Sequence, residues 1–295
     1  DEHLRFVFLT GVSKFAKAGI FSGLNNLKDI TLEMRYSAIC GYTEKDLMET
    51  FSERIPSASL PLLSAWYNGY SWTGESVYNP FDILLYLDEG VYRPYWFETG
   101  TPSFLVTLLN KKPRNLPELD NLLAGEELLS SSDIEDVHPE SLLFQTGYLT
   151  IKGETFAGSK RLYKVGFPNL EVKSAFSQLM LTSLTEKGNI SANQVRLANL
   201  LSAGDMGGLK EVFHSFFASI PHDWYRKIQI SGFEGYYASI VYAYVASLGY
   251  LVIPEDTTNH GQVDMTVQTS DGIWLFEFKV QGQTNRGENQ KSPLL

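Results

Sequence analysis

The sequence predicts an α/β protein whose first two-thirds is largely helical and whose C-terminal part combines a helix with a β-sheet. Apolar residues recur at helical spacing in several N-terminal stretches, and near the C-terminus two runs rich in β-branched and aromatic residues flank Asp271-Gly272. Asp-Gly between such runs is typical of a β-hairpin. The length of 295 residues, with 43% hydrophobic and 13% aromatic residues, provides for two modest domains with their own cores.

Composition narrows the class of protein. No uninterrupted apolar run approaches the roughly 20 residues that span a bilayer, and no basic and apolar leader opens the sequence. The single cysteine, Cys40, has no partner for an internal disulfide, which suits a reducing compartment. We therefore expect a cytoplasmic protein without a membrane partner. The net charge of −10 argues against a general DNA coat, because affinity for phosphate comes mostly from Lys and Arg, but it leaves room for a local basic surface.

The N-terminal part is expected to contain a strand followed by helices. Residues 5–10 are mostly apolar and predict a buried strand that leads into residues 11–14, Gly-Val-Ser-Lys. This stretch is not a phosphate loop, because it lacks the G-x-x-x-x-G-K-[ST] pattern. A helix is expected to begin after Thr43, and another after Asn79, with Asn79 as the cap and Pro80 at the first helical position.

Residues 66–72 form a dense aromatic stretch, Trp-Tyr-Asn-Gly-Tyr-Ser-Trp. Such rings stack on bases or sugars in proteins that bind single strands. The alternative is core packing around a glycine turn, which is the commoner role. The sequence leaves both interpretations open.

The middle of the chain predicts a helical and winged connector. A helical face is expected at residues 104–109, then a short helix, a turn and a strand within residues 142–151, and a hairpin with its tip at residues 153–159. The remaining helices are expected over residues 171–185, around 192–201 and over 209–220. The Gly-rich residues 202–208 mark a domain boundary.

The C-terminal hairpin sorts its side chains by face. If Asp271-Gly272 is a two-residue type I′ loop, counting outward places Asp264 opposite Lys279. Alternate residues of a strand point to opposite faces. One face is then apolar and belongs against a core: Val263, Met265, Val267, Trp274, Phe276, Phe278 and Val280. The other face carries Asp264, Thr266, Glu277 and Lys279.

The polar face of this hairpin has the residue types of a metal site. Two carboxylates held this close repel each other unless a cation lies between them. Asp264 and Glu277 supply the oxygen ligands that Mg²⁺ prefers, and Lys279 beside the ion would stabilise charge on a phosphate or help to position and deprotonate a water. The alternative is a surface salt bridge between Lys279 and either acid, worth about 0–1 kcal/mol. The hairpin by itself leaves both interpretations open.

The segment upstream of the hairpin favours the metal site. Apolar residues recur at helical spacing from Tyr237 onward, which predicts a buried helix beginning near Glu234. Gly249 ends this helix, and a strand is expected at residues 250–254. The order is therefore a helix with an early Glu, a strand, a strand with Asp, a turn, and a strand with Glu-x-Lys.

This order resembles the PD-(D/E)XK nuclease superfamily, with Asp264 as its Asp and Glu277-Phe278-Lys279 as its (D/E)XK. The resemblance implies a restriction-endonuclease-like α/β domain with a mixed sheet. It also implies Glu234 as a further acid at the metal site, the backbone carbonyl of Phe278 as an added ligand, and Mg²⁺ or Mn²⁺ as the cofactor.

Six further strings of sequence extend the resemblance along the chain. They lie at residues 8–15, 24–27, 66–70, 78–81, 144–149 and 167–171. Together they resemble bacterial proteins in which an AAA-ATPase-like domain precedes a PD-(D/E)XK nuclease domain.

The resemblance implies three parts. Residues 1–100 would be the C-terminal part of an AAA-ATPase-like domain without its P-loop, residues 101–204 a helical and winged connector, and residues 205–295 a PD-(D/E)XK nuclease-like domain truncated after the Glu-x-Lys strand. ATP is not expected as a cofactor of this chain, because the P-loop is absent.

Two functions from different classes follow. The first is a Mg²⁺-dependent nuclease that hydrolyses phosphodiesters in nucleic acid, with DNA as the expected partner and Asp264, Glu277, Lys279 and Glu234 as the catalytic residues. The second is a non-catalytic remnant or an interaction module in which the same acids form structural ion pairs only.

Overall fold

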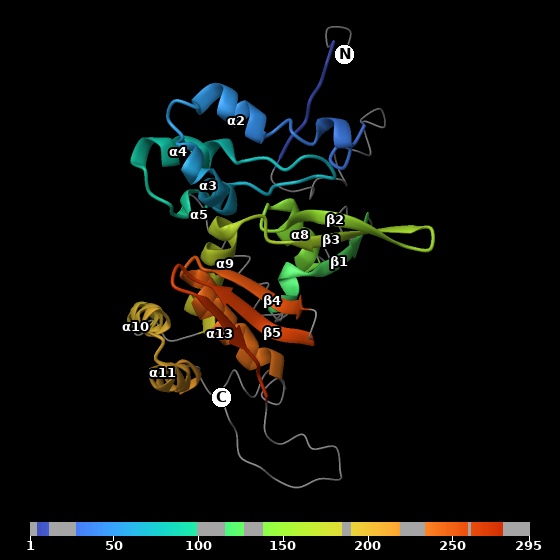
Figure 1. Cartoon of the computed structure of the whole chain (residues 1–295). Coiled ribbons are helices and arrows are strands. Elements are labelled where there is room, and N and C mark those ends of the chain that lie inside the picture. The colour runs from blue at the N-terminus through green and yellow to red at the C-terminus, as the bar shows by residue number, and fades with distance from the viewer. Residues whose placement is uncertain are drawn as a thin grey trace.

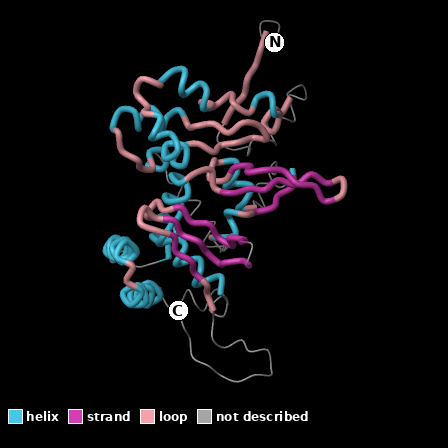
Figure 2. Tube along the Cα trace, in the orientation of Figure 1, coloured by secondary structure: helices cyan, strands magenta, loops and turns pink. Residues whose placement is uncertain are grey.

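The computed structural model describes residues 5–11, 28–98, 116–126, 138–184, 190–218, 234–258 and 261–279. The α/β class is confirmed: Figure 2 shows helices through the N-terminal part and two groups of strands after them. The two groups are three-stranded sheets, ordered β1-β3-β2 and β4-β5-β6. Every strand pair in these two sheets is antiparallel, so the expected mixed sheet is wrong for the part of the chain that the structure describes.

Short helices form the N-terminal unit, at the top of Figure 1. They are η1 (Met34–Tyr36), α2 (Glu44–Phe51), η2 (Ser57–Ser59), α3 (Leu60–Tyr67), α4 (Pro80–Glu89) and α5 (Tyr95–Glu98). The predicted helix starts are confirmed. Thr43 and Asp46 form a capping box at α2. At α4 the Asn79 side chain accepts the N–H of Phe81 at 3.0 Å.

The N-terminal helices enclose a core of their own. Its buried members are Leu47, Ile55, Leu63, Tyr67, Tyr78, Ile83 and Tyr95. Tyr67 belongs to the aromatic stretch at residues 66–72, and Tyr70 from the same stretch is buried in the second core of the molecule. Core packing is therefore the role of these two rings. The turn between them needs glycine, because Gly69 has a φ of +114° and a Cβ there would lie 2.1 Å from the carbonyl oxygen of Pro168.

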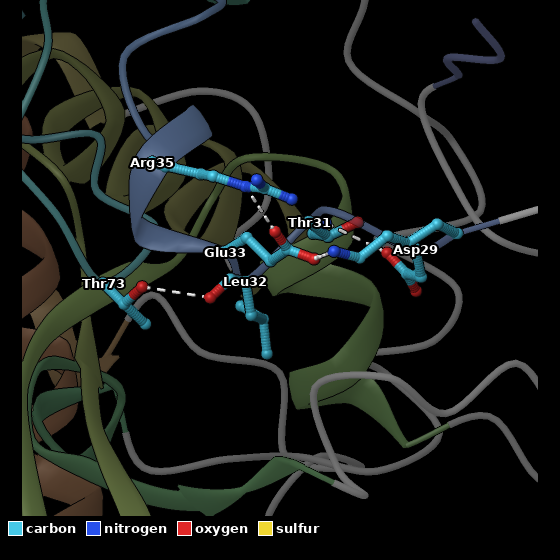
Figure 3. Close-up of polar contacts among 7 residues, drawn as sticks. Asp29, Thr31, Leu32, Glu33, Arg35 and Thr73 are labelled. Atoms are coloured by element: carbon cyan, nitrogen blue, oxygen red, sulfur yellow. Dashed lines mark hydrogen bonds and ion pairs between the residues drawn. The ribbon is translucent and has the colours of Figure 1, made fainter. Parts of the chain in front are cut away.

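Polar contacts hold residues 28–35 along the N-terminal unit (Figure 3). The Thr73 hydroxyl donates to the carbonyl oxygen of Leu32 at 3.1 Å. Glu33 accepts from Arg35 at 2.9 Å and forms an ion pair with Lys28. The Thr73 contact ties the segment to residues 71–74, and the Glu33 contacts hold the segment together.

The middle of the chain forms a small sheet and three longer helices. The elements are η3 (Pro117–Asp120), β1 (Leu122–Gly125), α8 (Pro139–Gln145), β2 (Thr150–Ala157), β3 (Lys160–Gly166), α9 (Leu170–Leu184), α10 (Ile190–Ala203) and α11 (Met206–Ala218). The β2–β3 hairpin projects from the body in Figure 1. Its turn is shorter than predicted, because pairing continues to Ala157 and Lys160.

The C-terminal part consists of α13 (Glu234–Ser247), β4 (Leu251–Thr258), β5 (Gly261–Gln268) and β6 (Ile273–Phe276). The predicted helix is confirmed, and Gly249 follows it with a φ of +77°. Helices α9 and α13 pack side by side, and one core contains buried residues of α9, α13 and β5. The boundary between residues 204 and 205 stays a prediction, but helices from its two sides share this core. Among the described residues, no helix has the length and apolar character to cross a membrane.

Two buried carboxyl groups lie where the N-terminal unit meets α9. Asp82 on α4 and Glu171 on α9 are both fully buried. Glu171 Oε1 accepts the N–H of Trp96 at 2.8 Å, whereas Glu171 Oε2 and both oxygens of Asp82 have no donor among the described residues. Burial, and then the neighbouring Asp82 carboxyl, raises the pKa of Glu171 to about 10, and burial raises the pKa of Asp82 to about 6. With its pKa raised this far, the Glu171 carboxyl keeps its proton at neutral pH and can donate it to Asp82.

The predicted strand at residues 5–10 is wrong. The described residues 5–11 form no strand, and Phe6 and Leu9 are 80% and 53% exposed. No described strand lies beside this segment to accept its backbone hydrogen bonds and cover its side chains, so apolar composition alone does not make it a buried strand. The helical face predicted at residues 104–109 lies outside the described residues.

Candidate active site

The β5–β6 hairpin has the two faces that the sequence predicts. On the apolar face Met265 and Val267 are buried, and Trp274, Phe276 and Phe278 pack against the same core. On the opposite face Asp264, Glu277 and Lys279 are exposed. The apolar face fixes the orientation of the sheet, because turning it over would expose the aromatic rings.

The register of this hairpin differs from the predicted one by two residues. Gln268 pairs with Ile273 and Met265 pairs with Phe276, and the Thr269 N–H donates to the carbonyl oxygen of Gly272 at 2.9 Å, so the turn lies at Ser270-Asp271 and not at Asp271-Gly272. The Thr269 hydroxyl accepts the N–H groups of Asp271 and Gly272 at 3.3 and 3.2 Å. Neither of these two residues has the positive φ of a type I′ turn. A shift of two keeps every side chain on its predicted face, and it places Asp264 opposite Glu277 in place of Lys279.

Asp264 joins β5 to the segment that follows β6. Its Oδ2 accepts the backbone N–H of Phe278 at 2.7 Å, the length of a charge-assisted hydrogen bond. This bond lies two residues after Phe276, where the ladder between backbones ends. The Asp264 side chain therefore takes the place of a strand carbonyl and brings its carboxylate next to the Glu-x-Lys segment.

Glu277 and Lys279 form an ion pair on the exposed face. Lys279 Nζ lies 3.2 Å from Glu277 Oε2, and the two side chains are 80% and 60% exposed. A pair this exposed contributes about 0–1 kcal/mol, so Lys279 can exchange Glu277 for another anion at little cost. The phenyl ring of Phe278, between them in sequence, points to the core side of the sheet.

Thr266 is the exception on the polar face. It is only 4% exposed, and its Oγ1 has no hydrogen-bond partner among the described residues. Its neighbours across the sheet are Ile253 and Leu275. On this face Thr266 therefore lies among apolar neighbours, and Asp264, two residues earlier on the same strand, lies beside charged side chains.

Sequence reasoning missed one acid at this level of the sheet. Glu255 on β4 lies between the pairs that Pro254 and Asp256 make with Met265 and Val263, which is the step opposite Asp264. It is exposed and has a φ of +50°, which is uncommon for a residue other than glycine. The strand was expected to end at residue 254, and extending the alternation beyond Pro254 would have found it.

The donor chemistry of the site suits a hard divalent cation. Asp264 and Glu277 offer carboxylate oxygens and Phe278 a backbone carbonyl, which are ligands that Mg²⁺ and Mn²⁺ take. No group of three His, Cys, Asp or Glu side chains in the described ranges lies close enough to hold a metal ion. Glu234, the predicted further acid, is the first residue of α13, and its side chain lies outside the described part. The pocket beside Leu32 and Lys152 contains none of these residues.

Comparison with known proteins found a relative along nearly the whole chain and a family match near its C-terminus. A curated protein of Azotobacter chroococcum mcd 1, described as an uncharacterized protein in the vnfD 5′ region, is 49% identical over 289 residues. The aligned region covers 98% of this chain and 56% of that protein, so the chain spans about half the length of its relative. No solved structure matches the chain. Residues 232–294, which contain every residue of the predicted site, match the family model described as the PD-(D/E)XK nuclease superfamily.

Proposed function

We propose that the C-terminal part of this chain is a metal-dependent nuclease that hydrolyses phosphodiesters in nucleic acid, with DNA as the substrate. One observation carries the proposal. The hairpin register gathers Asp264 and the Glu277-Phe278-Lys279 segment on the exposed face of a sheet whose other face is anchored in the core. The match of residues 232–294 to the nuclease superfamily supports the same chemistry.

Asp264 and Glu277 would hold Mg²⁺ or Mn²⁺, with the Phe278 carbonyl as a further ligand and Glu234 as a direct or water-mediated one. The ion would stabilise negative charge on the phosphate and lower the pKa of a bound water. The hydrogen bond from the Phe278 N–H fixes Asp264 beside Glu277 before any ligand binds. This order in the free protein reduces the cost of assembling the site.

Lys279 would act on the substrate and the water. Its ammonium group, which pairs with Glu277 in the free protein, would orient the attacking water or neutralise charge on the pentacoordinate phosphate. The water would lose a proton as its oxygen attacks phosphorus, the bond from phosphorus to the leaving oxygen would break, and the leaving oxygen would take up a proton.

The test is metal-dependent nicking of supercoiled plasmid by the full chain. We expect nicking with Mg²⁺ or Mn²⁺ that is lost in Asp264→Asn and Lys279→Met. Glu211→Gln is the matched control. Glu211 is also an exposed carboxylate, and it forms an ion pair at 2.7 Å with Arg196 of α10. Equal nicking by the wild type and Asp264→Asn would refute the proposal.

The second candidate is an interaction module whose acids form ion pairs only. The pair between Lys279 and Glu277 favours it, since this is the contact that a purely structural role requires. It predicts no nicking with any divalent metal and no effect of metal on the thermal stability of the chain.

The wider organisation is a separate proposal. Residues 1–100 would be the C-terminal part of an AAA-ATPase-like domain, residues 101–204 the connector and residues 205–295 the nuclease-like domain. The similarity of sequence strings along residues 8–171 supports it. ATP binding by the full chain, followed with a fluorescent nucleotide, tests the part that concerns residues 1–100, for which we expect no binding.

A further inference from the structure

Glu255 lies in the same row of the C-terminal sheet as Asp264. The pairs on either side of it, which Pro254 and Asp256 make with β5, belong to one register. No residue is inserted between these pairs, so Glu255 occupies the position on β4 opposite Asp264. Figure 1 shows the two strands side by side. In the register of β5 and β6, Glu277 occupies the position on the other side of Asp264, so the three acids form one row across the sheet.

Glu255 lies on the exposed face of this sheet. From residue 251 to residue 255 of β4, exposed or half-buried residues alternate with buried ones, and Glu255 is the last of the exposed set. Ile253, two residues earlier, pairs with Thr266, which lies on the same face of β5 as Asp264. The alternation therefore puts Glu255 on the face that carries Asp264.

Glu255 is the free carboxylate of this row. Asp264 accepts the N–H of Phe278, and Glu277 forms an ion pair with Lys279. Among the described residues, no hydrogen bond or ion pair involves the carboxylate of Glu255. This side chain is therefore available to a water or a proton without first giving up another contact in that part of the chain.

The backbone of Glu255 has a conformation that suits glycine. Its φ of +50° lies in the left-handed region, which costs free energy for a residue with a Cβ. Strained residues of this kind persist where the surrounding structure fixes them, and they collect at functional sites. Here β4 and β5 keep one register on both sides of the residue, so strand pairing holds it in place. Since glycine would be more stable at this position, the glutamate side chain points to a role other than stability.

The proposed reaction needs an acceptor for the proton of the attacking water. The ammonium group of Lys279 has no lone pair to accept it, and the carboxylates of Asp264 and Glu277 face the ion. Adjacent strands lie about 4.8 Å apart, so Glu255 is one strand from Asp264 and roughly 10 Å from the strand of Glu277. This separation agrees with the lack of a three-acid metal site in the described ranges. A water bound beside Asp264 nevertheless lies within reach of the Glu255 carboxylate, because side chains directly opposite each other have Cβ atoms about 5 Å apart.

We propose that Glu255 is the general base of the nuclease reaction. Its carboxylate accepts one proton from the attacking water as the water oxygen bonds to phosphorus and the bond from phosphorus to the leaving oxygen breaks. The leaving oxygen takes a proton from solvent, and Glu255 then returns its proton to solvent, which regenerates the carboxylate. The inference rests on the proposed function and adds the proton acceptor to it.

The test combines nicking of supercoiled plasmid with Mn²⁺ binding by the full chain. We expect Glu255→Gln to lower the nicking rate by roughly 10²-fold or more, which is what loss of a general base costs. It should bind Mn²⁺ as the wild type does, because the group that takes the proton is not a ligand of the ion, whereas Asp264→Asn should lose both activities. Asp271→Asn is the matched control. It removes an exposed carboxylate from the β5–β6 turn of the same sheet, and it should nick plasmid at the wild-type rate.

A second variant separates chemistry from folding. Glu255→Gly suits the positive φ, so its midpoint of thermal unfolding should equal or exceed that of the wild type while its nicking rate falls. Formate is a small carboxylate that fits the space left by the side chain and can accept the proton in its place. It should restore part of the nicking rate in Glu255→Gly, and none in Glu255→Gln or Asp264→Asn.

The failure of this inference can be told from the failure of the nuclease. Wild-type nicking rates in both Glu255 variants would overturn the inference alone. So would a rate in Glu255→Gly that formate does not raise, or Mn²⁺ binding that Glu255→Gln weakens as much as Asp264→Asn does, since Glu255 would then be a metal ligand. A wild-type chain that nicks plasmid with no divalent metal would refute the nuclease and the inference with it.

Discussion

Two pairs of acidic side chains lie at opposite extremes of solvent exposure. Asp82 and Glu171 are fully buried between the N-terminal unit and α9, whereas Asp264 and Glu277 are exposed at the end of the β5–β6 hairpin. The residue types are the same in both pairs. The difference in environment decides which pair is structural and which is open to a ligand.

The buried pair is held by a proton. Burial raises the pKa of Glu171 to about 10, so its carboxyl stays neutral and hydrogen-bonds to Asp82. Such a pair joins α4 to α9 and is fully buried. The exposed pair has a backbone donor on Asp264 and a lysine on Glu277, and both partners leave oxygens facing water. Acids in a pair are therefore candidates for metal binding only where they remain charged and accessible.

The largest difference between the exposed pair and the buried pair is expected when an acid of each is replaced by its amide. Asp264→Asn should lower the rate of plasmid nicking by roughly 10³-fold, because it removes charge that the proposed reaction requires, while the free energy of unfolding changes by about 0.5 kcal/mol or less. Glu171→Gln should nick plasmid at the wild-type rate. Both are measured by a nicking time course and a urea unfolding curve. Loss of nicking in Glu171→Gln would remove the distinction between the pairs.

The second largest effect is expected when an acid of each pair is truncated to alanine. Glu171→Ala removes the carboxyl that hydrogen-bonds to Asp82 and to the N–H of Trp96 and opens a cavity, so we expect a loss of about 2–4 kcal/mol in the free energy of unfolding. Glu277→Ala, the matched truncation in the exposed pair, should cost less than about 1 kcal/mol. Urea unfolding at pH 7 measures both. Similar losses in the two variants would contradict the structural role of the buried pair.

The pH dependence of stability gives a smaller effect. The unfolded chain loses the Glu171 proton near its ordinary pKa of 4.5, whereas the folded chain keeps it to about pH 10. The folded state therefore holds more protons between these values, and its stability falls as pH rises through that window. Glu171→Gln should flatten this fall. Thermal unfolding of both proteins between pH 5 and pH 9 checks it, and parallel curves would show that Glu171 is charged in the folded protein.

Thr266 is a buried polar residue two positions from Asp264 on the same strand, and its substitution gives the smallest expected effect. Its buried hydroxyl has no partner among the described residues, so Thr266→Val removes an unsatisfied group at nearly constant shape. We expect the free energy of unfolding to stay constant or to rise by up to about 1 kcal/mol. A loss of more than that would mean that the hydroxyl is hydrogen-bonded in solution.

Local signals in the sequence predict the elements better than the contacts between them. Caps such as Thr43 and Asn79 place helix starts, and alternation places Asp264 on the exposed face, because both depend on residues close in sequence. The turn lies one residue earlier than the Asp-Gly signal predicts, and the Thr269 hydroxyl accepts the N–H groups of Asp271 and Gly272 there. The pairing of Asp82 with Glu171 joins residues far apart in the chain, and no local pattern marks it.

The most direct test of the account is Mn²⁺ binding by the full chain, followed by electron paramagnetic resonance, in the two amide variants of the exposed pair and the one amide variant of the buried pair. We predict that Asp264→Asn and Glu277→Gln each weaken Mn²⁺ binding by roughly 10–100-fold, and that Glu171→Gln binds Mn²⁺ as the wild type does. Mn²⁺ affinity that is unchanged by Asp264→Asn and Glu277→Gln would contradict the account.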